Sequence, residues 1–246
     1  MIRQLRSEAA KVTTTTTILG MLAALGSLAV LGIVVHTYAL PADSLAATSG
    51  QRDLLTEIGI GIGGLFAALI GALSITTEFR TGTIRPTLLA APHRGGVIVA
   101  KAFVSAATGA VAVIVSVVTA STAARVTLAF RDMKSTPTTG DYLELLGGGA
   151  LAGGLLGIIG LALGAIVRAQ IPTFVALFTW LLFIENVLAE LPDTHRFLPG
   201  ALAQGITGQN REGILQDVWL AALLLGIYAT GTILVSVDAT RRRDVA

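Results

Sequence analysis

The side chains that could carry out chemistry in this 246-residue chain are few and widely spaced. The chain has no cysteine, so it offers no thiolate nucleophile, thiolate metal ligand or disulfide. Its three histidines, His36, His93 and His195, fall in different segments, which argues against a shared metal site or a Ser–His catalytic pair. We therefore predict that the chain is not an enzyme and binds no cofactor itself.

A glycine-rich stretch, Gly59-Ile-Gly61-Ile-Gly63-Gly64, matches in form the fingerprint that binds dinucleotides. That fingerprint needs a strand before it and a helix N-terminus that faces a pyrophosphate, whereas this stretch lies inside a long apolar segment. Glycines in such a segment let helices approach closely, and we expect that role here. A second series of this kind follows at Gly149, Gly153, Gly157, Gly160 and Gly164. The sequence leaves open whether these glycines pack within the chain or against a second copy.

Charged residues are scarce, and the uncharged stretches between them define the helices that must position the side chains named above. Only 13% of the residues are charged and 53% are hydrophobic, whereas a soluble domain has ~25% charged residues. Six windows carry no charged side chain: 12–35, 58–77, 102–124, 145–167, 169–184 and 218–237. A bilayer core of ~30 Å needs ~20 apolar residues of helix. Five windows are long enough alone. Window 169–184 is long enough if its helix continues past Glu185.

The sequence therefore predicts an all-α integral membrane protein with six transmembrane helices. We expect them at approximately 15–38, 54–77, 102–125, 145–167, 172–191 and 217–238, in a single transmembrane domain covering residues 1–246. The connections are too short for a globular domain of even ~50 residues, so a nucleotide-hydrolysing domain would belong to another polypeptide. The chain also lacks a Gly-Lys pair and hence a phosphate-binding P-loop.

The basic residues indicate which side of the membrane each connection faces. With six spans, the side that holds both termini carries 11 basic and four acidic residues, and the other side carries six basic and 11 acidic residues. Basic residues mark the cytoplasmic side, so we predict a multi-pass cell-membrane protein with cytoplasmic N- and C-termini. This topological role accounts for the basic residues, and we expect no nucleic-acid partner.

Two short helices are expected outside the spans. Residues 2–11 place apolar side chains opposite charged ones at helical spacing, which predicts an interfacial helix on the inner membrane surface. Its charged side chains are Arg3, Arg6, Glu8 and Lys11. Segment 198–208, after the fifth span, is too apolar for an ordinary loop and too short to cross the membrane. We expect a short re-entrant or interfacial helix there, ended by Gly205 or Gly208.

Two acidic residues lie near the outer ends of the predicted spans. Glu57 opens the second span, and Glu185 lies about 20 Å along the fifth helix from Pro172, in the outer third of the membrane. A carboxylate at that depth is costly unless it is paired, hydrated or protonated. Glu185 is therefore either a transport-path or gating acid, or a side chain of the helix end in the headgroup zone.

The longest cytoplasmic connection, residues 76–101, has the features of a docking element. Gly82 ends the preceding helix and Thr83 can cap a new one. The stretch Thr87-Leu-Leu-Ala-Ala91 gives that helix one apolar side, and Pro92 ends it. This short helix is flanked by Arg80, Arg85 and Arg94. It could insert into a groove on a partner protein. The alternative is a solvated loop whose arginines only set the topology.

The same connection resembles a known signature. Glu78-Phe-Arg-Thr-Gly-Thr-Ile-Arg85, followed by Leu88, Pro92-His-Arg94 and Lys101, is similar to the loop motif of the ABC-2 family of transporter permeases. The opening Ser7-Glu8-Ala-Ala-Lys11 likewise resembles that family's N-terminal interfacial helix, and the six spans and segment 198–208 also fit. Pro86 departs from the family pattern, which favours a more helical residue there.

The resemblance implies that this chain is one part of a larger transporter. In this family two permease subunits, alike or related, pair, and each engages a cytoplasmic ATPase subunit that holds ATP and Mg. The loop helix corresponds to the family's coupling helix, which sits in a cleft of the ATPase. At or near this contact the resemblance places Glu78, Arg80, Gly82, Thr83, Arg85, Leu88 and Arg94. The family consists mostly of exporters of amphipathic compounds, including drug-like molecules and peptides, and of lipid-linked or polysaccharide cargo.

Two other classes of function stay open. An ion- or proton-coupled secondary transporter would use Glu185 or Glu57 as its titrating group, although such proteins usually place ionisable groups near the membrane midplane. An intramembrane enzyme would need a Ser–His pair, a His/Glu metal cluster or paired aspartates within the spans. The permease subunit of an ATP-driven exporter is our leading hypothesis.

Overall fold

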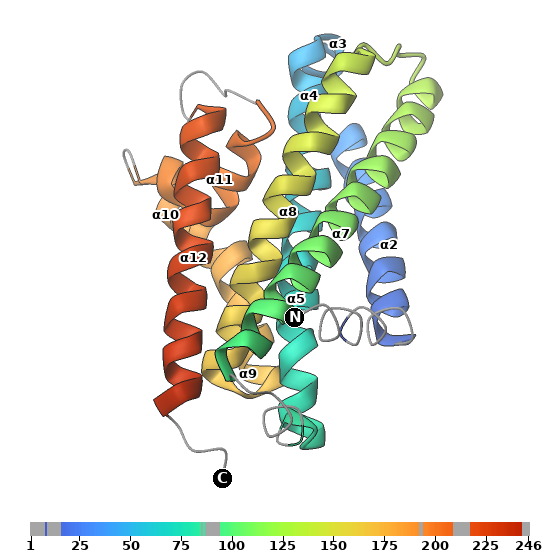
Figure 1. The fold of residues 1–246 in the computed structure, drawn as a ribbon. Coiled ribbons are helices and arrows are strands. Elements are labelled where there is room, and N and C mark those ends of the chain that lie inside the picture. Colours follow the sequence, from blue (N-terminus) through green and yellow to red (C-terminus); the bar gives the residue numbers. More distant parts are fainter. Residues whose placement is uncertain are drawn as a thin grey trace.

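The computed structural model describes residues 8, 16–84, 86, 94–191, 194–208 and 217–242. Within these ranges every regular element is a helix and none is a strand. Six helices of this described part are long and apolar enough to cross a membrane. The predicted all-α architecture with six spans is therefore confirmed, and the chain is a multi-pass membrane protein (Figure 1).

The first two spans are joined by a five-residue helix. The elements are α2 (Thr16–Ala39), α3 (Ala42–Ala46), α4 (Thr48–Leu55), the π-helical turn η1 (Thr56–Ile60) and α5 (Gly61–Thr81). Because α4, η1 and α5 follow one another without a break, the second span is a single helix over Thr48–Thr81. It ends as predicted at Gly82, whose φ of 71° is the left-handed conformation that glycine adopts readily.

The third and fourth spans are longer than their charge-free windows. They are α7 (Arg94–Phe130) and α8 (Thr139–Val167). A capping box starts α8, because the Thr138 side chain and the Asp141 side chain each accept a hydrogen bond from the other residue's backbone N–H. Since α5 continues to Thr81 and α7 begins at Arg94, the connection between them is shorter than the sequence predicted, and several of its charged residues lie within the helices.

The last two spans enclose a short helical segment. The elements are α9 (Gln170–Phe178), the π-helical turn η2 (Thr179–Ile184), α10 (Glu185–Ala189), the 3-10 helix η3 (His195–Phe197), α11 (Pro199–Gly205) and α12 (Val218–Arg242). The fifth span covers Gln170–Ala189, and Pro172 lies in its first turn as predicted. The helix expected within segment 198–208 is α11, and it ends at Gly205.

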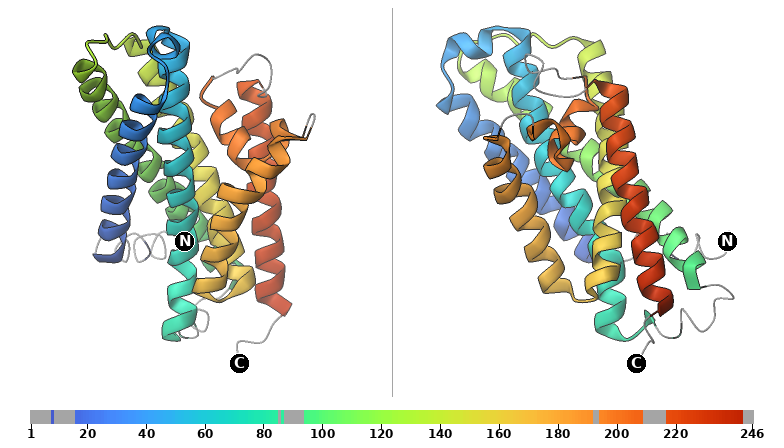
Figure 2. Two further views of the ribbon diagram at one scale, coloured as in Figure 1. Left: turned by 180° about the vertical axis from the view of Figure 1, so that it is seen from behind. Right: turned by 90° about the vertical axis from the view of Figure 1, so that its left-hand side faces the viewer.

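The bundle has two distinct ends. At one end, which we call the loop end, α5, α8 and α12 finish; at the other, the far end, α2 and α7 finish and α3 and α4 lie (Figures 1 and 2). Helix α8 runs through the middle and packs against α5, α7 and α12, while α2 packs mainly against α7. The short helices α10 and α11 lie beside the far-end half of α12.

Helix α8 touches its neighbours backbone to backbone. A Cβ on Gly160 would lie 1.9 Å from the carbonyl oxygen of Ala68 in α5, and a Cβ on Gly157 would lie 2.5 Å from the carbonyl oxygen of Ser105 in α7. Only glycine can occupy such positions without moving a helix. The predicted helix-packing role of the glycines is confirmed, and their packing partners at these positions are helices of the same chain.

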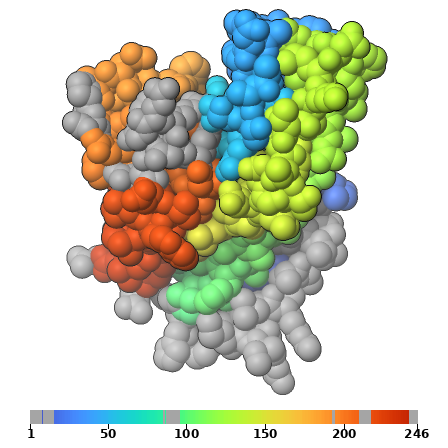
Figure 3. Space-filling view, turned by 90° about the horizontal axis from the view of Figure 1, so that it is seen from above, coloured from blue at the N-terminus to red at the C-terminus, as the bar shows by residue number. Residues whose placement is uncertain are grey.

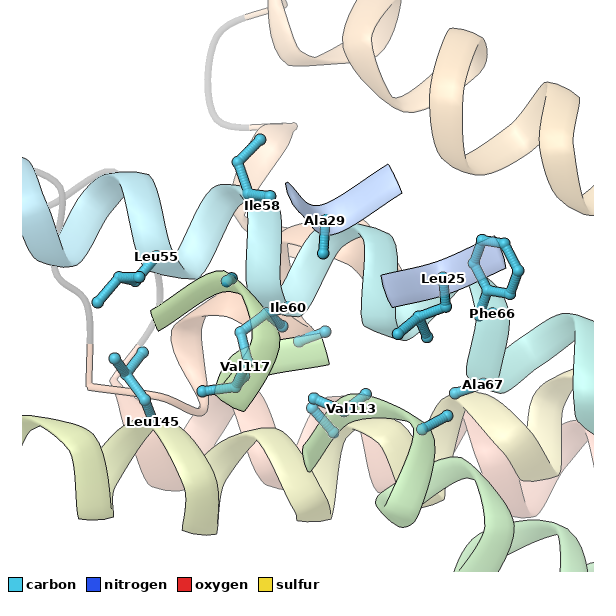
Figure 4. Close-up of a cluster of buried hydrophobic side chains, with 14 of the residues drawn as sticks. Leu25, Ala29, Leu55, Ile58, Ile60, Phe66, Ala67, Val113, Val117 and Leu145 are labelled. Carbon is cyan, nitrogen blue, oxygen red and sulfur yellow. The ribbon is translucent and has the colours of Figure 1, made fainter. Parts of the chain in front are cut away.

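The second span is the most enclosed of the six. Of its apolar stretch 83% is buried, against 17% in the first and fifth spans and 22% in the sixth. Around it lies an apolar core to which α2, α4, η1, α5, α7 and α8 contribute, with Leu25, Leu55, Ile60, Val113 and Leu145 among its members (Figure 4). The outer faces of α2, α9 and α12 expose large apolar side chains, which a membrane or another protein must cover.

Polar side chains fasten the helices together at the far end. Arg52 of α4 pairs with Asp141 and Glu144 of α8, with N–O distances of 2.6 and 2.9 Å. The amide of Gln51 donates a hydrogen bond of 2.9 Å to the carbonyl oxygen of Lys134 in the connection between α7 and α8. Seen from above, α3 and α4 (blue) therefore lie directly beside this connection (yellow-green in Figure 3).

We predict that Gly160→Ala destabilises the protein by about 1–3 kcal/mol, because the added methyl group must separate α8 from α5. The matched control is Gly226→Ala in α12, where no atom of the described residues lies within 4 Å of the added methyl group. This control should be neutral or gain up to about 1 kcal/mol of helix stability. Thermal unfolding of both variants in the same detergent checks this, and equal unfolding midpoints would contradict the close contact.

Candidate functional site

Lys101 is a cation buried at the loop end of the bundle, where its side chain is only 1% exposed. Its Nζ donates to Glu8 Oε2 at 2.5 Å and to Glu78 Oε1 at 2.8 Å. A third, longer hydrogen bond of 3.4 Å runs to the carbonyl oxygen of Ser74. We call Lys101, Glu8 and Glu78 the buried ionic triad.

The contacts of the triad match what a buried ammonium group requires. An ammonium group has three N–H donors, and Lys101 finds three acceptors. Taking a charge out of water costs several kcal/mol unless such partners replace the solvent. The attraction between Lys101 and its two carboxylates therefore holds their three chain segments together. Separating these segments would leave an uncompensated charge in the apolar interior.

Three segments that are distant in the sequence supply the triad. Ser74 and Glu78 are one turn apart on α5, so both face the same side of that helix. Lys101 lies about two turns into α7. Glu8 comes from the chain before α2. The triad therefore ties the N-terminal segment to the two helices that flank connection 82–93.

Apolar contacts reinforce the base of this connection. Ile84 and Val97 are each 3% exposed and pack together with Phe79 near the end of α5. The guanidinium of Arg168, in the turn after α8, lies over the Phe79 ring at 5.4 Å from its centroid. Arg168 also donates a hydrogen bond of 3.3 Å to the carbonyl oxygen of Ala239 in α12. Both ends of the connection are thus held by the bundle.

The predicted docking residues fall into two groups. Glu78 is 6% exposed and points toward Lys101, so it belongs to the base of the connection and not to its exposed surface. Arg80 and Thr83 are exposed, and Gly82 ends α5.

The remaining predicted site residues lie at or beyond the limits of the description. Arg94 is the first residue of α7. The predicted short helix of the connection lies largely outside the described residues, as do Arg85 and Leu88. The predicted interfacial helix also lies outside them, except for Glu8. Among its charged residues, Arg3, Arg6 and Lys11 are therefore not described.

The sequence did not reveal Lys101 as the centre of this site. The sequence places Lys101 in the loop motif and on the cytoplasmic side, just before the predicted third span, but predicts no partner for it. The available signal was its position: Lys101 stands directly before one charge-free window, and Glu78 stands directly after another. Two opposite charges that border adjacent spans at the same membrane face are well placed to pair once each helix continues by a turn.

A cavity of about 600 Å³ opens beside the triad. Its polar lining includes all three triad residues together with Ser74 and Gln170. The apolar lining comes from Ile18, Ile70, Leu73 and Val104. A space of this size accommodates a drug-sized molecule, and its mixed lining suits a compound with one polar and one apolar part.

The two acids that the sequence singled out have different surroundings. Glu57 of η1 is about half exposed and lies 3.9 Å from Nε2 of His36 in α2. Glu185 lies within the fifth span, and only 8% of this residue is exposed, which is unusual for a carboxylate. Its oxygens accept hydrogen bonds from the indole N–H of Trp180 at 3.0 Å and from the backbone N–H of Gly200 at 2.9 and 3.1 Å. Glu185 therefore joins the fifth span to α11.

Across the described ranges, no group of three or more His, Asp or Glu side chains is arranged to hold a metal ion. The ion pairs and hydrogen bonds described above join helices and segments of this part of the chain. No protein-family model matches the chain, and no curated protein matches it in sequence.

We predict that Lys101→Met costs about 3–5 kcal/mol of stability, because it leaves two carboxylates buried without their cation. Arg80→Met is the matched control: this side chain is exposed near the end of α5, two residues after Glu78, and surface substitutions usually change stability by less than about 0.5 kcal/mol. Adding Glu8→Gln and Glu78→Gln to Lys101→Met should restore much of the loss. Thermal unfolding measures all three, and a Lys101→Met protein as stable as Arg80→Met would refute the triad.

Proposed function

We propose that this chain is the membrane-spanning permease subunit of an ATP-driven exporter of the ABC-2 type. Its connections are too short to fold into a nucleotide-hydrolysing domain, so ATP and Mg would be bound by a separate ATPase subunit. The loop end would face the cytoplasm of a cell-membrane protein, in agreement with the charge distribution. Two permease chains, identical or related, would form the translocation path together.

The pairing of Glu78 with Lys101 is the observation that carries this proposal. These residues are the first and last charges of the segment that resembles the ABC-2 loop motif, and the structure brings them 2.8 Å apart. A connection whose two ends are joined in this way cannot move without moving both helices. It therefore has the property that a docking loop needs if it is to transmit force from a partner protein.

The mechanism follows from linkage between two binding equilibria. ATP binding that draws two ATPase subunits together would displace the loops docked on them. Because the base of each loop is held by the triad and by Phe79, Ile84 and Val97, the displacement passes into α5 and α7. The difference in nucleotide affinity between the two arrangements then supplies the free energy for changing access to the path.

The cavity beside the triad supports an amphipathic cargo. It offers an apolar wall and a polar end, and it borders the helices that the loop would move. Drug-like compounds, peptides and lipid-linked molecules all have this division into two parts. A substrate with one apolar and one polar part is therefore the class that we assign to the exporter.

An ion- or proton-coupled secondary transporter is the second candidate, and the burial of Glu185 is the observation that favours it. A buried carboxylate within a span is a common feature of proton-coupled carriers. The two candidates differ in their energy source. Export that continues after the proton gradient is collapsed, and stops when ATP is withheld, would exclude the secondary transporter.

We predict that Arg85→Glu and Leu88→Asp abolish both co-purification of an ATPase subunit and ATP-dependent export of an amphipathic dye from membrane vesicles. Reversed charge or a buried carboxylate in the docking contact would cost several kcal/mol. Lys134→Glu is the control, because it reverses an exposed charge at the opposite end of the bundle. The ATPase subunit is identified by mass spectrometry through its P-loop sequence. Normal export by both loop variants would refute the docking contact.

A further inference from the structure

The segment after the fifth span is packed into the bundle. Leu198, Leu202 and Ile206 are between 1% and 6% exposed. Helix α11 packs against α8, α12 and the far-end part of the second span. A Cβ on Gly148 of α8 would lie 2.5 Å from the carbonyl oxygen of Ile206, so this contact is again backbone to backbone. α11 therefore fills the space between three spans in the far-end half of the molecule.

Glu185 is the side chain of the fifth span that holds α11 in this place. Both of its carboxylate oxygens accept hydrogen bonds from the backbone N–H of Gly200, in the first turn of α11. The fit is close, because a Cβ on Gly200 would lie 2.3 Å from Glu185 Oε2. An alanine at position 200 would therefore displace the Glu185 carboxylate from its present position.

The π-helical turn η2 gives Glu185 its second partner. Trp180 and Glu185 are five residues apart, and their side chains are joined by a hydrogen bond of 3.0 Å. In an α-helix such residues would point about 140° apart, whereas the wider turn of a π-helix brings them to the same face. The indole N–H therefore orients the carboxylate toward Gly200.

We propose that Glu185, Trp180 and Gly200 form a latch that keeps α11 in its closed position between the spans, so that Glu185 positions α11 and is not an ion carrier. The inference rests on the proposed export function for its biological meaning. Because α11 packs against α8, α12 and the second span, a conformational change that opens the far-end half of the bundle would have to displace it. Release of the latch would let α11 move in such a change.

Site-specific labelling of a thiol tests the latch directly. The chain has no cysteine, so Ala203→Cys places a single thiol on the buried side of α11, where Ala203 is 2% exposed. In the full-length protein in lipid nanodiscs we expect Glu185→Ala to raise its labelling rate by a polar maleimide about tenfold or more, since a charge-assisted hydrogen bond is lost. Gly200→Ala should have the same effect although it retains the carboxylate. Glu185→Gln, which keeps one acceptor oxygen, should be intermediate.

Two controls separate local release from general unfolding. Glu190→Ala removes an exposed acid at the end of the same span and should leave labelling unchanged. A thiol at Ala112→Cys, in the fully buried core of α7, should stay protected in every variant. The latch is overturned if labelling at position 203 does not rise, if Glu190→Ala raises it equally, or if the core thiol becomes reactive to the same degree.

The labelling result does not depend on the proposed export function. It uses the permease alone, so failure to find an ATPase subunit would remove the exporter and leave the latch standing. Conversely, unchanged labelling together with normal ATPase binding would remove the latch and leave the exporter.

Discussion

The structure depends on the close contact of α8 with α5 and α7. Lipid offers no hydrophobic driving force between helices, so their association relies on packing and on hydrogen bonds. Here that packing is achieved at glycines such as Gly157 and Gly160, where two backbones meet with no side chain between them. This contact fixes the relative positions of α5 and α7 along their length. Their ends then meet at the base of connection 82–93, and that meeting allows Glu78 and Lys101 to pair.

In the buried ionic triad, one buried charge fixes the relative positions of three segments of the chain. The free energy spent on removing Lys101 from water is recovered only in an arrangement that supplies all its acceptors. Such an arrangement is specific, since apolar side chains would tolerate many registers between α5, α7 and the N-terminal segment. Glu185 serves the same purpose in the far-end half, where a carboxylate meets neutral N–H donors. Both sites join elements that are distant in the sequence.

The sequence predicted the number and type of the spans because a bilayer imposes a minimum length of uncharged helix. It made the second and third spans too short, because the charge-free windows stop at charged residues such as Glu78 and Lys101, whereas pairing lets a helix carry these residues inside the bundle. Spacing indicated that the glycines of α8 permit close approach, but it held no information on the identity of the partner helix. The bond between Glu185 and Gly200 was also beyond prediction, because it depends on a π-helical turn and on a backbone N–H group.

The same contacts determine where motion is possible in the bundle. Helices that meet backbone to backbone cannot be compressed, so we expect α5, α7 and α8 to move as one body when the base of connection 82–93 is displaced. Changes of shape must then occur where helical hydrogen bonding is already irregular, and the two π-helical turns are such places. One of them, η1, contacts α11, and the other, η2, carries Trp180 and precedes Glu185. In the proposed exporter, movement at the loop end would therefore reach α11 through α5, α7 and α8. The helices would then change shape at η1 and η2.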